Sequence, residues 1–156
     1  MSLQIDYLAD HPELLAVVAE WHYREWSHLS SDASADACAE RLRGEARRGG
    51  IPTLFLALAA GAPIGTASLR AHDMDGRDDL SPWLAGVYVC PPNRRSGVGA
   101  ALVRRVVSEA ATLGVPILYL YTTSQQNEAF YSHLGWSVRE RVEYHGVRRV
   151  IMSIAP

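Results

Sequence analysis

The amino-acid sequence predicts an α/β domain with a mixed, mostly antiparallel sheet. Two apolar runs, 53–59 and 64–70, are separated by an Ala-Gly-Ala-Pro turn and indicate an antiparallel hairpin. A strand, an amphipathic helix and a second strand follow over 83–122, so these two strands are expected to be parallel neighbours. The runs 138–143 and 147–154 are typical of a closing hairpin. Together these patterns predict that the strands form one mixed sheet in an α/β domain.

The N-terminal third supplies one more strand, at 3–8, and two more helices. Asp10 and Glu13 have the spacing of a capping box and predict that the first helix begins here. The second helix is expected over 34–48, where two glycines end it. With a short helix near residue 130, the total is about seven strands and four helices.

Composition limits the classes of protein. The 156 residues fit one domain, 1–156, and 48% apolar with 21% charged residues is a globular composition. The net charge of −2 gives no basic field for nucleic acid. No apolar run is as long as a membrane span and no signal peptide is recognised, so we expect a cytoplasmic protein. Cys38 and Cys90 lack metal-site spacing, and no metal is predicted.

Two glycines near the start of the central helix, Gly97 and Gly99, point to a bound anion. Each glycine inside a helix costs about 1 kcal/mol relative to alanine, so two in one opening turn need a physical reason. The first N–H groups of a helix have no intrahelical partner, and the helix dipole adds positive charge there. Arg94 and Arg95 precede the glycines, and Ser96 is expected to cap the helix. This combination favours a pyrophosphate at the helix start.

Two well-known glycine-rich loops fit this segment less well. A P-loop needs a Lys-Ser/Thr pair after its glycines, whereas Ala100 and Ala101 follow here. A dinucleotide fingerprint needs a third small residue and an acidic residue after the next strand, and neither is present. An ordinary turn that packs tightly around its glycines is the remaining alternative.

The segment Arg94-x-x-Gly97-x-Gly99, after the strand Val87-Tyr88-Val89, resembles the acetyl-coenzyme A motif of the GNAT family of N-acetyltransferases. Downstream, the segment 130–136 is similar to the family's closing helix, with its tyrosine and Leu-Gly-aromatic ending. The resemblance implies a GNAT-type fold whose central parallel strands splay apart. It also implies transfer of an acetyl group from acetyl-CoA to a primary amine, by direct attack in a ternary complex.

The resemblance assigns coenzyme contacts by position. Main-chain groups of Val87, Tyr88 and Val89 are expected to bind the pantetheine and the acetyl carbonyl. Gly86 is expected to mark a strand bulge there. The predicted pyrophosphate contacts are Arg94, Arg95, Ser96, Gly97, Val98, Gly99 and Ala100.

Tyr131 matches the family tyrosine that protonates the departing thiolate. Asn127 lies one helical turn before Tyr131 and is a further coenzyme candidate. The family's asparagine more often stands earlier, where this chain has Ser124, and this departure leaves the contact of Asn127 open.

The resemblance places the acceptor pocket near the first helices. Tyr23, Glu25 and Trp26 are the substrate-binding candidates, and Trp26 favours a small cationic acceptor because tryptophan faces attract cations. The resemblance implies that the acceptor is a small-molecule or peptide amine. Candidates for the general base, left open because the central strand has no acid, are His22, Glu25, His72, Asp78 and Asp79.

The sequence leaves two alternative functions open. One is a catalytically inactive acyl-CoA-binding sensor or interaction module, and the other is an enzyme that transfers a longer acyl chain. No Ser-His-Asp order or His-Glu-x-x-His spacing supports nucleophilic or metal catalysis. The family resemblance also allows a homodimer through the closing strand 147–154.

Overall fold

The computed structural model describes residues 2–29 and 33–156. In this part of the chain, seven strands form one sheet in the order β1-β2-β3-β4-β5-β7-β6, and all neighbours are antiparallel except β4 and β5. The mixed sheet and the four helices confirm the predicted fold class. The strands are β1 (Leu3–Tyr7), β2 (Thr53–Ala59), β3 (Ala62–Arg70), β4 (Trp83–Val89), β5 (Leu118–Thr122), β6 (Ser137–Tyr144) and β7 (Val147–Ile154). The α-helices are α1 (Leu15–Trp26), α2 (Ala35–Glu45), α3 (Val98–Thr112) and α4 (Gln125–His133).

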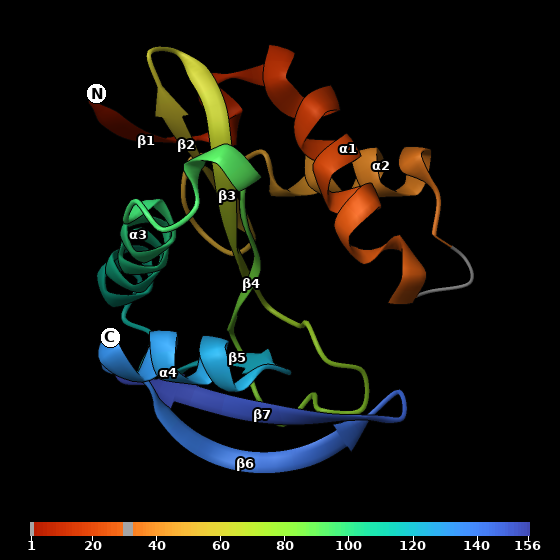
Figure 1. The fold of residues 1–156 in the computed structure, drawn as a ribbon, viewed down its shortest axis with the longest axis vertical. Coiled ribbons are helices and arrows are strands. Elements are labelled where there is room, and N and C mark those ends of the chain that lie inside the picture. The colour runs from red at the N-terminus through yellow and green to blue at the C-terminus, as the bar shows by residue number, and fades with distance from the viewer. Residues whose placement is uncertain (1, 30–32) are drawn as a thin grey trace.

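The sheet carries helices on both faces of β1–β4. Helix α3 packs against β2, β3 and β4 on one face, while α1 and α2 pack together on the other (Figure 1). Leu102, Val103 and Val106 of α3 are fully buried in the core between α3 and the sheet. Both sides of β2 are therefore covered, and all seven of its residues are buried. This explains its continuous apolar run.

The parallel strands β4 and β5 meet only at one end. Among the described residues, their single register pair is Trp83 with Tyr119, and the Tyr119 N–H donates to the Pro82 carbonyl at 3.1 Å. Beyond this point β4 continues with the upper half of the molecule and β5 with the lower half (Figure 1). The rest of β4 has no neighbouring strand on this side, so its main-chain groups there, other than the Val89 carbonyl that a side chain binds, are available to another partner.

A β-bulge lies at Gly86, as the sequence predicts. Gly86 and Val87 of β4 stand opposite the single β3 residue Ala67. Gly86 has φ of 59°, a left-handed conformation. A Cβ at this position would lie 3.1 Å from the His22 ring and 3.2 Å from Arg70 Nη2. The bulge therefore needs glycine for both its backbone angle and its close packing.

The predicted capping box at the start of the first helix is wrong. Residues Leu8–Asp10 and Pro12–Leu14 form two 3-10 turns, and α1 begins only at Leu15, without a side-chain cap. The carboxylate of Asp10 instead lies 2.9 Å from Arg48 Nε. The Asp10 carboxylate, which was expected to cap the helix, is therefore used in an ion pair.

Helix α2 starts as predicted but ends earlier. The Ser34 hydroxyl accepts the Ala37 N–H at 3.0 Å and so caps the helix. The helix ends at Glu45, three residues before the predicted end at Arg48. Glu45 is buried and binds Arg70 and Ser68 from β3. The end of α2 is therefore held to the sheet by polar contacts.

Helix α3 differs from its prediction at its start. Gly97, in the left-handed region with φ of 88°, occupies the cap position predicted for Ser96. The Ser96 hydroxyl donates instead to the Asn93 carbonyl. The last turn of the helix contains Glu109, which is buried and accepts the Tyr7 hydroxyl at 2.8 Å, and Leu113 just beyond the helix is 42% exposed.

Candidate active site

A cavity of about 620 Å³ lies between the free end of β4, the start of α3 and α4. It is lined by every predicted coenzyme residue except Ser96 and Val98. Val98 is buried in the core, and Ser96 is tied to the preceding turn. The predicted residues in the lining are Val87, Tyr88, Val89, Arg94, Arg95, Gly97, Gly99, Ala100, Asn127 and Tyr131. We call this cavity the coenzyme cleft.

The start of α3 provides an open cradle on this cleft. A Cβ at Gly97 would meet no atom within 4 Å, and one at Gly99 would come only to 3.5 Å from Phe130. The two glycines are therefore not required by packing alone. Because the first N–H groups of α3 lack intrahelical acceptors, an anion can approach them closely. This geometry fits a pyrophosphate.

The two arginines before the cradle are used differently. Arg94 Nε donates to the Val89 carbonyl at 2.8 Å, and its guanidinium lies 5.7 Å from the centre of the Tyr88 ring. Arg94 thus braces the end of β4. The side chain of Arg95 is exposed and forms no hydrogen bond or ion pair within the described residues. Its charge is free to meet a phosphate.

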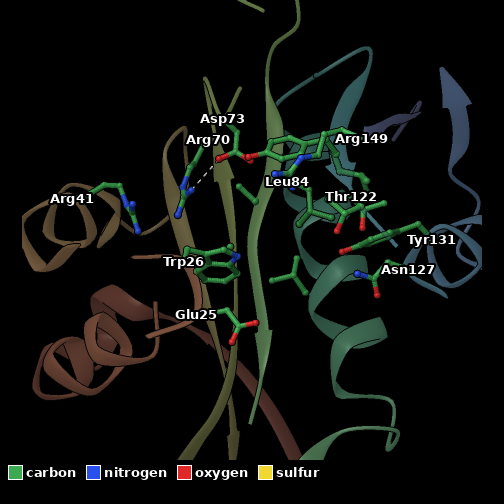
Figure 2. A pocket seen from close by; sticks show the side chains of 16 residues that line it. Glu25, Trp26, Arg41, Arg70, Asp73, Leu84, Thr122, Asn127, Tyr131 and Arg149 are labelled. Atoms are coloured by element: carbon green, nitrogen blue, oxygen red, sulfur yellow. Dashed lines mark hydrogen bonds and ion pairs between the residues drawn. The ribbon is translucent and has the colours of Figure 1, made fainter. Parts of the chain in front are cut away.

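Tyr131 reaches the cleft from α4. Tyr131 is only 9% exposed, and burial raises the pKa of its hydroxyl to about 12. The hydroxyl has no hydrogen-bond partner among the described residues. Figure 2, which shows the cavity next to this cleft, shows the side chains of Tyr131 and Asn127 pointing into that cavity. Ser124, where the family's asparagine is more usual, caps α4 by accepting the Asn127 N–H at 2.9 Å. Asn127 lines the coenzyme cleft, whereas Ser124 does not.

A second cavity, of about 420 Å³, adjoins the coenzyme cleft. Both cavities are lined by Glu25, Val87, Asn127 and Tyr131. We call the second one the acceptor pocket. Other polar or aromatic residues of its lining are Trp26, Arg41, Arg70, Asp73, Tyr121, Thr122, Thr123 and Arg149. Figure 2 shows this pocket from close by.

Ion pairs on one wall of the acceptor pocket form a balanced network. Arg70 Nε lies 3.1 Å from Glu45 Oε2, and Arg70 Nη1 lies 3.2 Å from Asp73 Oδ1. Arg41 Nε lies 3.6 Å from the same Glu45 oxygen. Burial raises the pKa of Asp73 to about 6, against the opposing effect of Arg70. Two arginines thus meet two carboxylates here.

The candidate substrate and base residues are only partly brought together. Glu25 and Trp26 line the acceptor pocket, whereas Tyr23 lines a separate cavity of about 240 Å³ between α1 and α2. The base candidates His72 and Asp78 lie outside both main cavities. His72 Nδ1 is 3.7 Å from the exposed carboxylate of Asp78. Asp79, a third candidate outside them, binds Arg77 at 3.0 Å. Of the loop acids, only Asp73 reaches the pocket.

His22 is buried and holds the bulge. The Thr66 hydroxyl donates to the Gly86 carbonyl at 3.0 Å, so His22 Nε2 must be the donor to that hydroxyl, also at 3.0 Å. Burial lowers the pKa of His22 to about 3, with Arg70 and Arg41 adding to the effect. A neutral imidazole of such low basicity is suited to positioning the strand and is a poor general base.

Sequence reasoning missed the arginines and the aspartate of the acceptor pocket. The charge pattern assigns Arg41 to a solvated helix face and Asp73 to an ordinary acidic loop. The burial of Arg149 could have been detected from the sequence. Side chains alternate between the two faces of a strand, so Arg149 shares a face with the apolar Ile151, which is fully buried. Arg70, at the end of β3, carried no such signal.

Neither a metal centre nor a membrane span is found in the described ranges. Within residues 2–29 and 33–156, no group of three His, Cys, Asp or Glu side chains is placed to hold a metal ion. Over the same ranges, no helix combines the length and the apolar character needed to cross a bilayer.

The sequence model of the Acetyltransferase (GNAT) family matches residues 15–136. The chain belongs to the GNAT acetyltransferase family. This confirms the family, fold and acyltransferase class predicted from the sequence. Among curated proteins, no sequence matches significantly.

Solved GNAT structures share the fold at low identity. An aminoglycoside 6'-N-acetyltransferase complexed with coenzyme A is 17% identical with a TM-score of 0.74, covering 99% of this chain and 97% of that one. The yncA protein of Salmonella typhimurium, solved with its cofactor acetyl-CoA, is 17% identical with a TM-score of 0.73, covering 99% and 94%. Ribosomal-protein-alanine N-acetyltransferase of Brucella melitensis is 19% identical with a TM-score of 0.71, covering 100% of both chains. Identities this low support the fold and leave the acceptor of this GNAT protein open.

Proposed function

We propose that this protein is an N-acetyltransferase that moves the acetyl group of acetyl-CoA to a primary amine by direct attack in a ternary complex. The observation that carries this proposal is the meeting of two cavities at Glu25, Val87, Asn127 and Tyr131. One cavity fits the coenzyme and the other is large enough for a small acceptor. Both substrates can therefore be present at once.

The coenzyme cleft offers suitable partners along its length. The start of α3 and Arg95 hold the pyrophosphate, and the unpaired main chain of β4 holds the pantetheine and orients the acetyl carbonyl. The bound coenzyme supplies an activated acetyl group and a thiolate leaving group. Holding both reactants in one site accounts for much of the expected rate enhancement, because the reaction becomes effectively unimolecular.

Tyr131 assists the leaving group mainly by hydrogen bonding. An ordinary thiol has a pKa of about 8.5, whereas burial raises the pKa of Tyr131 to about 12. Full proton transfer from the tyrosine to the thiolate is therefore uphill. A hydroxyl with no protein partner can still donate a hydrogen bond to the sulfur as negative charge develops there. Its removal should slow the reaction without abolishing it.

Glu25 is the proposed proton acceptor for the amine. An amine attacks only in its neutral form, so its proton must leave the site. Of the five base candidates from the sequence, Glu25 alone lines both cavities. It forms no ion pair or hydrogen bond within the described residues. It can accept the proton directly or through one water.

The test is an amine screen with two readouts. Purified protein is incubated with acetyl-CoA and a panel of primary amines, while coenzyme thiol release and N-acetyl products are measured by absorbance and mass spectrometry. The proposal predicts one acetylated amine per thiol released. Tight acetyl-CoA binding with no product across the panel would support the inactive coenzyme-binding module instead. Competition by longer acyl-CoA thioesters tests the acyl-chain alternative. The single-domain organisation, cytoplasmic location and homodimer stay predictions.

A further inference from the structure

Arg149 is a buried cation in the acceptor pocket without an acidic partner. The residue is 8% exposed, and its Nε atom has no hydrogen-bond partner. It forms no ion pair with any described carboxylate. A buried unpaired charge is unfavourable because the lost hydration is not replaced. Its presence in a pocket wall indicates that a ligand supplies the missing anion.

Two tyrosine rings hold the Arg149 guanidinium in place. Its Cζ atom lies 5.7 Å from the centre of the Tyr121 ring and 5.9 Å from that of Tyr144. The two rings contact each other edge to face at 5.6 Å, and the Tyr144 hydroxyl accepts the Asp75 N–H at 3.1 Å. Ring faces attract the cation but do not replace carboxylate acceptors. The two rings therefore fix Arg149 in position, while N–H donors of its guanidinium remain free to bind a ligand.

The charges of the pocket point to a zwitterionic acceptor. Arg41 and Arg70 are matched by Glu45 and Asp73 through the ion pairs of the pocket wall. This leaves one cation, Arg149, and one anion, Glu25, without an ion-pair partner among the described residues. Figure 2 shows Arg149 toward one end of the pocket and Glu25 toward the other. A ligand with a carboxylate at one end and an amine toward the other matches both.

The acceptor pocket contains a second arginine with an unpartnered donor. Arg70 binds its two carboxylates through Nε and Nη1, whereas Nη2 is buried with no hydrogen-bond partner. Arg70 and Arg149 both line the acceptor pocket. Because only one positive charge remains unbalanced, a monoanion fits better than a dianionic phosphate. Arginine also has the planar geometry that pairs with a carboxylate.

The same charges disfavour a polycationic acceptor. Three arginines line the pocket, and its cations are not outnumbered by acids even when Glu45 is included. Aminoglycosides carry several ammonium groups and need an excess of negative charge. Trp26 alone favours a small cationic acceptor. The three arginines of the pocket instead favour an acceptor that also carries a negative charge.

We propose that the acceptor is a small amine bearing a carboxylate, such as a free amino acid or a close derivative, and that Arg149 binds the carboxylate. This inference rests on the proposed N-acetyltransferase function. The neutral amine nitrogen forms a bond to the acetyl carbon as the carbon–sulfur bond breaks. One proton leaves the nitrogen, and the thiolate takes up one proton. Arg149 takes no part in these bond changes and determines which amine is bound.

The kinetic test compares acids with matched amides. The probes are the twenty protein amino acids and their α-carboxamides, which keep the amine and lose the carboxylate. The amine of the carboxamide is the weaker base and is more often neutral, so a preference for the acid cannot come from amine availability. The best acid should exceed its carboxamide in kcat/KM by about tenfold or more, the usual effect of a charge-assisted hydrogen bond.

Variants assign the preference to Arg149. In Arg149→Gln the acid-to-amide ratio should fall to about one, with the KM for acetyl-CoA unchanged. Arg148→Gln is the matched control, because Arg148 is the adjacent residue of β7, is exposed and does not line the acceptor pocket. Arg149→Lys keeps the charge without the planar donors and should also lower the ratio. It serves as the second variant should Arg149→Gln fail to fold.

Direct binding separates the two proposals. Amino acids and carboxamides are titrated calorimetrically into wild type and Arg149→Gln in the presence of coenzyme A, which requires no turnover. Binding of an acid by wild type that is about tenfold weaker in the variant supports the carboxylate site even if no amine is acetylated. Acids that bind no better than carboxamides, bind equally to the variant, or do not bind at all would overturn it. Acetylation of simple amines with no such preference would leave the N-acetyltransferase function standing.

Discussion

Glu25, near the end of α1, and Tyr131, in α4, line the same junction between the coenzyme cleft and the acceptor pocket. In the proposed reaction, Glu25 takes a proton from the amine and Tyr131 donates a hydrogen bond to the leaving sulfur. The strands β4 and β5 share a single register pair among the described residues, so β4 has no strand partner where its Val87 lines this junction. The proposed chemistry therefore depends on a strand pair that separates after one register pair.

Replacement of Tyr131 by phenylalanine should lower kcat by about tenfold to a hundredfold, with small changes in either KM. The ring stays in the core, so the fold is kept, and only the donor to the sulfur is lost. Steady-state kinetics with the best amine measures this effect. Because the pKa of Tyr131 is about 12, wild-type kcat should show no loss from tyrosine ionisation up to about pH 10. Unchanged kcat in the variant would remove Tyr131 from the reaction.

Replacement of Glu25 by glutamine should lower kcat/KM for the amine by about a hundredfold at neutral pH. The deficit should shrink as pH rises, because the free amine then arrives already deprotonated. A pH series of kcat/KM for wild type and variant measures the difference. Glu20→Gln, an exposed glutamate of the same helix paired with Arg24 at 3.7 Å, is the control and should behave as wild type. A pH-independent deficit would indicate a binding role instead.

Asp73 should make the protein less stable as pH rises from about 4 to about 6. The folded-state pKa is about 6, above the ordinary value of 3.8, so the native state holds a proton that the unfolded chain has released. The associated stability is fully present below pH 3.8 and is lost as pH passes the folded pKa. Urea unfolding of wild type and Asp73→Asn should diverge by an amount on the order of 3 kcal/mol across this window. Parallel pH curves for the two proteins would contradict a raised pKa.

Replacement of Gly86 by alanine should destabilise the protein by more than backbone strain alone. Gly86 has φ of 59°, and the new Cβ would approach His22 and Arg70 to 3.1 and 3.2 Å. Gly61→Ala is the control, since Gly61 has φ of 79° with no atom near its Cβ. We expect about 1 kcal/mol for the control and about 2–3 kcal/mol for Gly86→Ala, measured by denaturant unfolding. Equal effects would show that the packing around the bulge yields easily.

Most residues that line the coenzyme cleft could be predicted to lie together, because their sequence signals are local. Gly97 and Gly99 lie close to one another and to a strand end, and Tyr131 is fixed by its own short helix. The order of strands and helices also followed from local periodicity. What local spacing could not show was the left-handed cap at Gly97, which displaced Ser96.

The acceptor side could not be predicted because its charges come from distant segments. Glu45 joins Arg41 and Arg70, and Asp73 pairs with Arg70. The burial of Glu45 depends on how α2 docks on β3. Arg149 becomes isolated from acids only when β7 pairs with β5 and Tyr121 covers it. Tyr23 shares the cavity between α1 and α2 with Trp26, its neighbour one helical turn on, but only Trp26 also lines the acceptor pocket.

The most direct measurement is calorimetric titration of acetyl-CoA into wild type, Arg95→Glu and Arg104→Glu. Arg95 lines the coenzyme cleft, whereas Arg104 is exposed on α3 outside it. We expect binding by wild type and Arg104→Glu with one site per chain, and binding about tenfold or more weaker for Arg95→Glu, because a phosphate contact becomes a repulsion. Equal affinity of all three folded proteins would contradict a pyrophosphate at the start of α3, and no binding by wild type would contradict the coenzyme cleft itself.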